Sequence, residues 1–380
     1  MKYNKIEYNY DVIIVGGGPA GTTAAYLLDK KGYEVLIIDK KKFPRNKLCG
    51  GLLTKKTLNI LSDIYNFNVK DLKKDKVINY ISDSYKIYFK DKLITNNNMK
   101  DKFHLVKRNV YDNYLLRSIK KKNIKIKENT KVNDIDFKKN TIITDKKEKL
   151  RANYIIAADG ANSKIRNKLL TKRKLKKSSF IKNNQSITLE IEVPREKFNF
   201  DLKEPILYFG VINWGYGWVF PKQDNITVGL GGLKRKNSNF KKLFQSYLKL
   251  INLEITESNI KGWPLPFGNY LEKPVYKNTF LIGDAANFVD PLTGEGIYYA
   301  HKSALIVSEV IDELFQKGTD NTNLYKRRIN HEINSNLKRA KLYRTILWSS
   351  PKFIQNLLVR LGSKYFHDKI TRTIQGYNLF

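Results

Sequence analysis

The stretch Asp11-Val-Ile-Ile-Val-Gly-Gly-Gly-Pro-Ala-Gly21 decides the fold. Its first five residues are typical of a buried parallel strand, and a glycine-rich turn follows without a gap. Residues 22–30 then predict a helix, and residues 33–38 predict a second strand that ends at Asp39. A strand, a turn, a helix and a second strand within 40 residues predict a dinucleotide-binding unit of the Rossmann type.

Each part of this unit has a physical role in holding a dinucleotide. Gly16 permits the tight turn, Gly18 lets a pyrophosphate approach the backbone, and Gly21 lets the helix pack closely on the sheet. The free N–H groups at the helix start face the phosphates, and Asp39 can accept a hydrogen bond from a ribose hydroxyl. An ordinary glycine-rich turn is disfavoured, because an acidic residue ends the next strand 18 positions after the last glycine.

The composition excludes several kinds of site and segment. One cysteine cannot form an intramolecular disulfide or a multi-cysteine zinc or iron–sulfur site, and the four histidines show no metal-ligand spacing. No apolar run approaches the ~18–20 residues that span a bilayer, and the N-terminus has no apolar signal region. We therefore expect a cytoplasmic protein without a metal site.

The net charge of +35 has two interpretations. Lysine and asparagine are abundant throughout the chain, which is typical of a compositional bias with solvated charges. The alternative is attraction to a polyanion: a nucleic acid, an anionic membrane or a phosphorylated substrate. No nucleic-acid-binding motif stands out, so no nucleic-acid partner is expected.

Nucleotide-binding patterns occur at both ends of a chain whose middle is rich in strands. Residues 154–157 and 280–282 predict buried strands, while residues 78–105 and 185–234 alternate as antiparallel strands do. Gly229-Leu-Gly-Gly232 is not followed by a helix, so we interpret it as a turn, and the chain has one built-in dinucleotide site. This order predicts a discontinuous cofactor domain with a sheet inserted into it.

Further motifs follow the first unit. They are Pro44-Arg-Asn-Lys-Leu-Cys49-Gly50-Gly51, Asp159-Gly160-Ala-Asn-Ser163-Lys-Ile-Arg166, Tyr216-Gly-Trp218-Val-Phe220-Pro221-Lys222, and Gly283-Asp284-Ala-Ala286 leading to Pro291-Leu-Thr-Gly294-Glu-Gly296-Ile297. Together with the opening unit, they resemble FAD-dependent oxidoreductases of the geranylgeranyl reductase family, within the larger aromatic-hydroxylase-like group of flavoproteins. The resemblance covers roughly residues 10–320.

The predicted fold class is α/β: a discontinuous Rossmann-like FAD domain, an inserted, mainly antiparallel β-sheet substrate domain and a helical C-terminal tail. The expected boundaries are 1–175 and 275–330 for the FAD domain, with 78–105 adding strands to the substrate sheet, 176–274 for the substrate domain and 331–380 for the tail.

The resemblance implies that FAD is bound non-covalently. The residues that it assigns to the cofactor are Gly16, Gly18, Ala20, Gly21, Asp39, Cys49, Gly50, Gly51, Arg108, Val132, Asp159, Gly160, Gly283, Asp284, Gly294, Gly296 and Ile297. Asp284 would bind a ribityl or ribose hydroxyl, and the helix N-terminus after residues 291–297 would stabilise the anionic reduced flavin. Alternatively, Arg108 is a surface arginine at a helix start and Asp159 is a plain turn residue.

Cys49, Tyr216 and Trp218 are the expected catalytic residues. The resemblance places Cys49 close to the flavin, although a single cysteine is more often a small buried hydrophobe. Tyr216, Trp218 and Phe220 alternate and therefore share one face of a strand. They either form an apolar wall for a prenyl chain or pack in the core of a sheet.

The resemblance implies reduction of isolated carbon–carbon double bonds in a prenyl lipid or prenyl diphosphate. Hydride would come from reduced flavin and a proton from ordered water, Cys49 or a tyrosine. NAD(P)H or ferredoxin, an electron-donor protein, would supply the electrons. An aromatic-hydroxylase-type monooxygenase and a quinone-linked flavin dehydrogenase are the alternatives.

The C-terminal region contains a candidate membrane contact. Ser350-Pro351 predicts a helix start, and Ile354, Leu357, Leu358 and Leu361 follow at helical spacing. This face either packs on the protein's own core or docks on an anionic membrane, which would place the protein peripherally at the inner face of the cell membrane.

Overall fold

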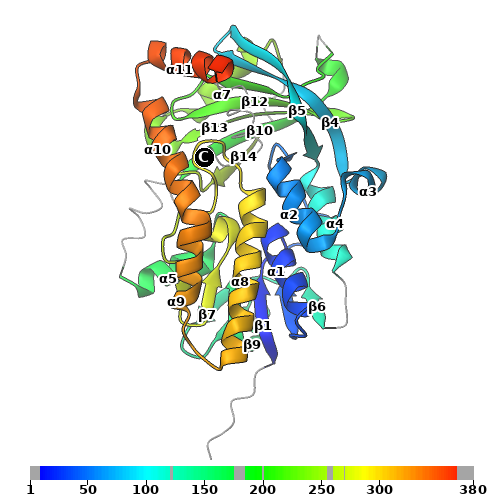
Figure 1. Ribbon diagram of the computed structural model, residues 1–380, viewed down its shortest axis with the longest axis vertical. Helices are drawn as coiled ribbons and strands as arrows, with labels where there is room; N and C mark the ends of the chain where they lie inside the picture. Colours follow the sequence, from blue (N-terminus) through cyan, green and yellow to red (C-terminus); the bar gives the residue numbers. More distant parts are fainter. Residues whose placement is uncertain are drawn as a thin grey trace, which may run out of the picture.

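The computed structural model describes residues 9–119, 123–174, 185–198, 201–254, 260–268 and 270–365. Figure 1 shows a sheet flanked by α1 and α8 in its lower half and a second sheet above it, with α10 running alongside both. None of the helices in these ranges is long and apolar enough to cross a bilayer.

The first sheet joins the two ends of the chain. Its order is β15 (Val275–Tyr276), β16 (Thr279–Leu281), β9 (Lys149–Ala157), β1 (Tyr10–Val15), β2 (Val35–Ile38) and β6 (Ile124–Lys127), with β8 (Thr141–Thr144) pairing β9 and β7 (Val132–Asp136) pairing β8. The run from β16 to β6 is parallel. Val12, Ile13 and Ile14 are fully buried, which is typical of a parallel strand covered on both faces.

The second sheet lies beside the first and is antiparallel except where β11 meets β4. Its order is β14 (Lys261–Leu265), β10 (Ser186–Pro194), β13 (Asn225–Leu233), β12 (Gly215–Pro221), β11 (Ile206–Phe209), β4 (Ile78–Phe89), β5 (Lys92–Val106) and β3 (Leu52–Leu53). Helix α7 (Phe240–Leu250) packs Phe244 and Tyr247 against Ile191 and Val193 of β10. One face of the sheet is therefore core, and the other is free to form a site.

The predicted turn at residues 229–232 is wrong, because these glycines lie inside β13. Gly229 is paired with Trp218 of β12 and with Glu190 of β10. A Cβ on Gly229 would lie 2.1 Å from the Trp218 ring. The glycine is thus needed where an indole crosses the strand, and a Gly-rich sequence alone does not distinguish this close approach from a turn.

The other helices pack on both sheets: α1 and α8 flank the first, and α11 packs on β5 of the second. They are α1 (Pro19–Asp29), α2 (Lys55–Tyr65), α3 (Val69–Lys74), α4 (Arg108–Ser118), α5 (Lys164–Lys172), α8 (Ile297–Lys317), α9 (Asn323–Ile329), α10 (Ser335–Ser349) and α11 (Lys352–Tyr365). The predicted α/β class, with a Rossmann-type sheet and C-terminal helices, is confirmed.

A buried histidine ties three of these helices together. His301 of α8 is fully buried; its Nδ1 lies 2.7 Å from Thr23 Oγ1 of α1, and its Nε2 lies 2.7 Å from Tyr111 Oη of α4. Burial lowers the pKa of His301 to about 3, so the imidazole is neutral at physiological pH. It therefore links the helices by hydrogen bonds without placing a charge in the core.

Candidate functional site

A cavity of about 1700 Å³ lies between the two sheets. Its lining comes from the turns after β1, β9 and β16, from the cavity face of β10 and β12, and from α10 and α11. The cavity therefore connects the glycine-rich unit of the first sheet to the C-terminal helices, which is where an extended cofactor and a substrate could meet.

The glycine-rich turn leaves the N-terminus of α1 open toward the cavity. Gly16 has φ of +111°, and a Cβ there would lie 2.3 Å from the carbonyl oxygen of Ala158. Gly18 is the N-cap of α1 and carries no side-chain cap, and the nearest neighbour of a Cβ there is an Arg45 nitrogen at 3.3 Å. Asp39 Oδ2 accepts the N–H of Gly17 at 2.8 Å, which ties the turn to the end of β2. Uncapped N–H groups beside an acidic residue suit a pyrophosphate and its ribose.

A second helix N-terminus faces the same cavity. Gly296 is the N-cap of α8, again without a side-chain cap, and the first turn contains no acidic residue. Gly294 has φ of +75°, and a Cβ on it would lie 3.2 Å from Tyr216 Oη. Since two uncapped helix ends line one elongated cavity, the residues present fit a dinucleotide with an anionic reduced ring system.

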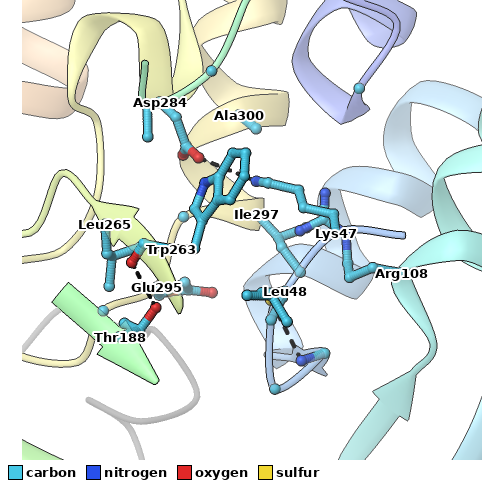
Figure 2. A pocket seen from close by; sticks show the side chains of 18 of the residues that line it. Lys47, Leu48, Arg108, Thr188, Trp263, Leu265, Asp284, Glu295, Ile297 and Ala300 are labelled. Atoms are coloured by element: carbon cyan, nitrogen blue, oxygen red, sulfur yellow. Dashed lines mark hydrogen bonds and ion pairs between the residues drawn. The ribbon is translucent and has the colours of Figure 1, made fainter. Parts of the chain in front are cut away.

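Charged side chains gather where the two sheets meet. Figure 2 shows Lys47 and Trp263 pointing into the cavity from opposite sides, with Lys47 Nζ 3.1 Å from Asp284 Oδ2. Arg108 is buried and forms a bidentate pair with Asp112 through Nε (2.8 Å) and Nη2 (2.9 Å). Although burial would raise it, the pKa of Asp112 is lowered by the Arg108 guanidinium. The surface alternative for Arg108 is therefore wrong.

The segment around Cys49 is held against the second sheet. The N–H of Cys49 donates to Glu190 Oε1 at 3.1 Å, and its Sγ accepts the N–H of Gly51 at 3.4 Å. Gly51 has φ of +73°, and a Cβ there would lie 2.0 Å from a backbone oxygen, so a side chain is excluded. Lys222 Nζ donates to the carbonyl of Gly50. This segment is half-buried, fixed in place and exposed to the cavity.

Tyr216 and Trp218 face the cavity from β12. Both are half-buried, and their ring centroids are 6.0 Å apart. Tyr216 donates its hydroxyl hydrogen to the carbonyl of Thr293. It therefore links the second sheet to the loop before α8. The pair lies on the cavity face of the sheet, opposite the α7 core.

Most of the predicted site residues come together around the cavity. Those lining it are Gly16, Gly18, Ala20, Asp39, Cys49, Gly50, Gly51, Arg108, Val132, Asp159, Gly160, Tyr216, Trp218, Asp284, Gly294, Gly296 and Ile297. Gly21 and Gly283 do not line it. A Cβ on Gly21 would lie 1.9 Å from Gly16 O, and one on Gly283 would lie 3.1 Å from Ala20 Cβ. These two glycines permit close packing beneath the cavity.

Sequence reasoning missed Glu190, and it named Lys222 only as part of the motif that begins at Tyr216, without a role of its own. Glu190 is 4% exposed, and burial raises the pKa of its carboxyl to about 7. Lys222 is 2% exposed, and burial lowers the pKa of its ammonium to about 8. The available signal was a carboxylate in the middle of the apolar run Leu189-Glu190-Ile191, since a buried charge is rare without a function or a partner.

Comparisons with known proteins agree with this arrangement. A family model described as an FAD binding domain matches residues 9–209. An uncharacterized protein of Methanosarcina barkeri is 32% identical, over 87% of this chain and 82% of its own. A digeranylgeranylglycerophospholipid reductase of Methanococcus vannielii is 28% identical, over 80% and 77% of the two chains. The crystal structure of a geranylgeranyl bacteriochlorophyll reductase-like protein from Thermoplasma acidophilum aligns with a TM-score of 0.78 at 21% identity, over 93% and 91% of the chains.

The backbone at Gly18 provides a direct test of cofactor binding. Its φ of −75° suits any residue, so Gly18→Val should fold, but its side chain would occupy the pyrophosphate position. We expect FAD affinity to fall by at least ~100-fold. The measurement is the flavin released into the supernatant by acid precipitation of purified protein.

Gly17→Ala is the matched control, because its Cβ would make an ordinary 3.5 Å contact with Phe43. This variant should remain yellow. A normal flavin content in Gly18→Val, or a wild-type protein that is colourless and cannot be reconstituted, contradicts the site.

Proposed function

Because the chain belongs to the geranylgeranyl reductase family of FAD-binding oxidoreductases, we propose that it hydrogenates isolated carbon–carbon double bonds of a prenyl lipid. The relatives' names motivate the substrate class: one reductase is named for a digeranylgeranylglycerophospholipid, another for geranylgeranyl diphosphate. The observation that carries the proposal for this chain is the polarity of the cavity, which changes along its length.

The cavity is polar at the glycine-rich turn and apolar beyond Trp218. The apolar part is lined by side chains of the second sheet and of the C-terminal helices: Tyr85, Ile87, Phe103, Leu207, Phe209, Phe220, Leu347, Leu358 and Val359. Apart from the Tyr85 hydroxyl, the side chains of this wall are hydrocarbon, so they offer little that would select a polar aromatic substrate. The wall suits a long hydrocarbon chain, whose burial is favourable in proportion to its apolar area.

Bound FAD supplies the hydride for this reaction. The residues of the chain have distinct tasks around it. The N-terminus of α8 favours negative charge on the reduced ring system. The segment of Cys49, Gly50 and Gly51, clamped by Lys222 and Glu190, forms one wall at the reacting end. Trp218 and Phe220 exclude water from the alkene, which is a poor hydride acceptor unless a proton arrives early.

The decisive test is anaerobic turnover of dithionite-reduced protein. Geranylgeranylated glycerolipid and geranylgeranyl diphosphate are offered separately, and the products are read by mass spectrometry. We expect a gain of two hydrogen atoms for each double bond reduced, together with reoxidation of the flavin. Oxygen-dependent hydroxylation of an aromatic compound with NAD(P)H, or quinone reduction without a change in any prenyl lipid, would identify one of the alternatives.

The position of Cys49 leads to a second prediction. Cys49→Ala should retain FAD, because the backbone N–H to Glu190 is unaffected, but it removes the acceptor for the Gly51 N–H. We expect alkene reduction to slow by about tenfold or the number of reduced bonds to change. Cys49→Ser keeps an acceptor and should lose less. Unchanged rates and products in Cys49→Ala would mean that Cys49 only contributes to packing.

We also propose that the protein docks reversibly on an anionic membrane, from which the lipid enters the cavity. Helix α11 has apolar side chains on both its inner and its outer side. On the inner side, Val359 is buried and Ile354 is half-buried. On the outer side, Phe353, Leu357 and Leu361 are 74%, 50% and 39% exposed. On α10, Leu342 and Ile346 are also exposed. These five exposed apolar side chains all belong to the two C-terminal helices, and Ile346 itself lines the cavity.

Vesicle co-sedimentation tests this docking. Basic residues near an anionic leaflet contribute about 1 kcal/mol each, so binding should require anionic lipid and weaken at high salt. Phe353→Ser with Leu357→Ser should reduce it, whereas Leu250→Ser, at an exposed leucine of α7, should not. Binding that is absent, or that is indifferent to both salt and the double substitution, contradicts the proposal.

A further inference from the structure

The cavity face of β10 carries the carboxyl group of Glu190, which accepts the N–H of Cys49. Thr188, Glu190 and Glu192 alternate along this face, while Ile191 and Val193 point into the core with α7. Glu190 is the buried member of the three, at 4% exposed, whereas Glu192 is exposed. It lines the cavity next to the Cys49 segment.

The neighbouring strands are shaped around this carboxyl. Glu190 and Trp218 are both paired with Gly229, from opposite sides of β13. Because Gly229 has no side chain, the Trp218 indole lies across β13, and a Cβ at Gly229 would be 2.7 Å from its Nε1. The indole therefore extends from β12 toward β10, where its interaction with Glu190 opposes the effect of burial on the pKa of the carboxyl.

The charges around Glu190 come from each element that packs against it. Cys49 donates its backbone N–H at 3.1 Å, Lys222 approaches from the end of β12, Glu192 lies on the same strand, and Lys261 is opposite on β14. Burial dominates this balance and raises the pKa of Glu190 to about 7, with Lys222 opposing the shift. The carboxyl is therefore partly protonated at neutral pH and can both give and regain a proton.

Other acids at this end of the cavity are engaged elsewhere. Tyr216 donates its hydroxyl hydrogen to Thr293, and burial raises its pKa. Glu295 forms an ion pair with Lys56 at 2.6 Å and accepts a hydrogen bond from Thr57.

We propose that Glu190 is the catalytic acid that protonates the alkene, an inference that rests on the proposed reductase function. The carboxyl O–H bond breaks and its proton forms a C–H bond with one alkene carbon, using the π electron pair. Hydride from reduced FAD forms the C–H bond at the other carbon. FAD is thereby oxidised, the C=C bond is reduced, and Glu190 is left as a carboxylate near the Lys222 ammonium. Water would then reprotonate Glu190, and an external donor, NAD(P)H or ferredoxin, would supply the two electrons that return the flavin to its reduced state.

The test compares Glu190→Gln with Glu192→Gln, a neighbour on the same cavity face. Dithionite-reduced, FAD-loaded proteins are mixed anaerobically with geranylgeranylated glycerolipid, and flavin reoxidation is followed. We expect Glu190→Gln to be at least ~100-fold slower, and wild type to slow about tenfold between pH ~6 and ~8, since the acid must be protonated. This pH dependence should vanish in Glu190→Gln and persist in Glu192→Gln. If Glu190→Gln does not bind FAD, Lys222→Met is tested in its place. Because Lys222 lowers the pKa of Glu190, the decline in rate should then occur at higher pH than in wild type.

A readout independent of turnover separates failure of this role from failure of the proposed function. Infrared difference spectra of FAD-loaded wild type and Glu192→Gln should show a protonated carboxyl lost as pH rises through about 7, and this signal should be absent from Glu190→Gln. A carboxyl already ionised at pH ~5, near its ordinary value, overturns the assignment whatever the substrate is. So does full alkene reduction by Glu190→Gln. A correctly titrating Glu190 in a protein that reduces no prenyl substrate overturns the proposed function and the alkene-protonating role with it.

Discussion

The contact between Gly21 and Gly16 is the constraint on which the rest of the structure depends. A Cβ on Gly21 would lie 1.9 Å from the carbonyl oxygen of Gly16, so α1 begins directly against the end of β1. Helix α8 then packs on α1, with Ser308 donating to the carbonyl of Ala24 and His301 bonded to Thr23. Because the two helices are fixed side by side, their uncapped N-termini open into one cavity. Residues from both ends of the chain thereby form a single site.

Two clusters of charged side chains lie at the cavity. Arg108, Asp112 and Arg45 form one buried cluster, with Arg45 3.3 Å from the Asp112 carboxylate. Glu190 and Lys222 form the other. A buried charge without a partner costs several kcal/mol, so each group is retained next to an opposite charge or a backbone dipole. Past Trp218 the wall is mainly hydrocarbon. The Cys49 segment and the aromatic side chains of β12 thus lie between the charged part of the cavity and its apolar part.

Local chemistry explains what could be predicted from the sequence. The glycine-rich unit and its strand and helix are specified within 40 residues, and most of the motif residues around the cavity could be named. Gly229 and Glu190 could not be interpreted in the same way. Their surroundings arise from the pairing of β10, β12 and β13. The residues next to a position in the sequence do not reveal its partner on another strand. For Arg108 the sequence allows both a site and a surface position, although Asp112 at the i+4 position offers a partner for a buried arginine.

The tail shows why sequence motifs alone leave the substrate undetermined. The family motifs end near residue 320, yet Tyr343, Leu347, Leu358 and Val359 of α10 and α11 line the apolar part of the cavity. Trp348 stacks on Phe209 of the second sheet, and Val359 packs with Phe103 and Leu105. Shape at this end depends on the volume and spacing of apolar side chains, which many sequences satisfy equally well. The motifs thus specify the end of the cavity at the glycine-rich turn, while the shape of the apolar end depends on residues that carry no motif.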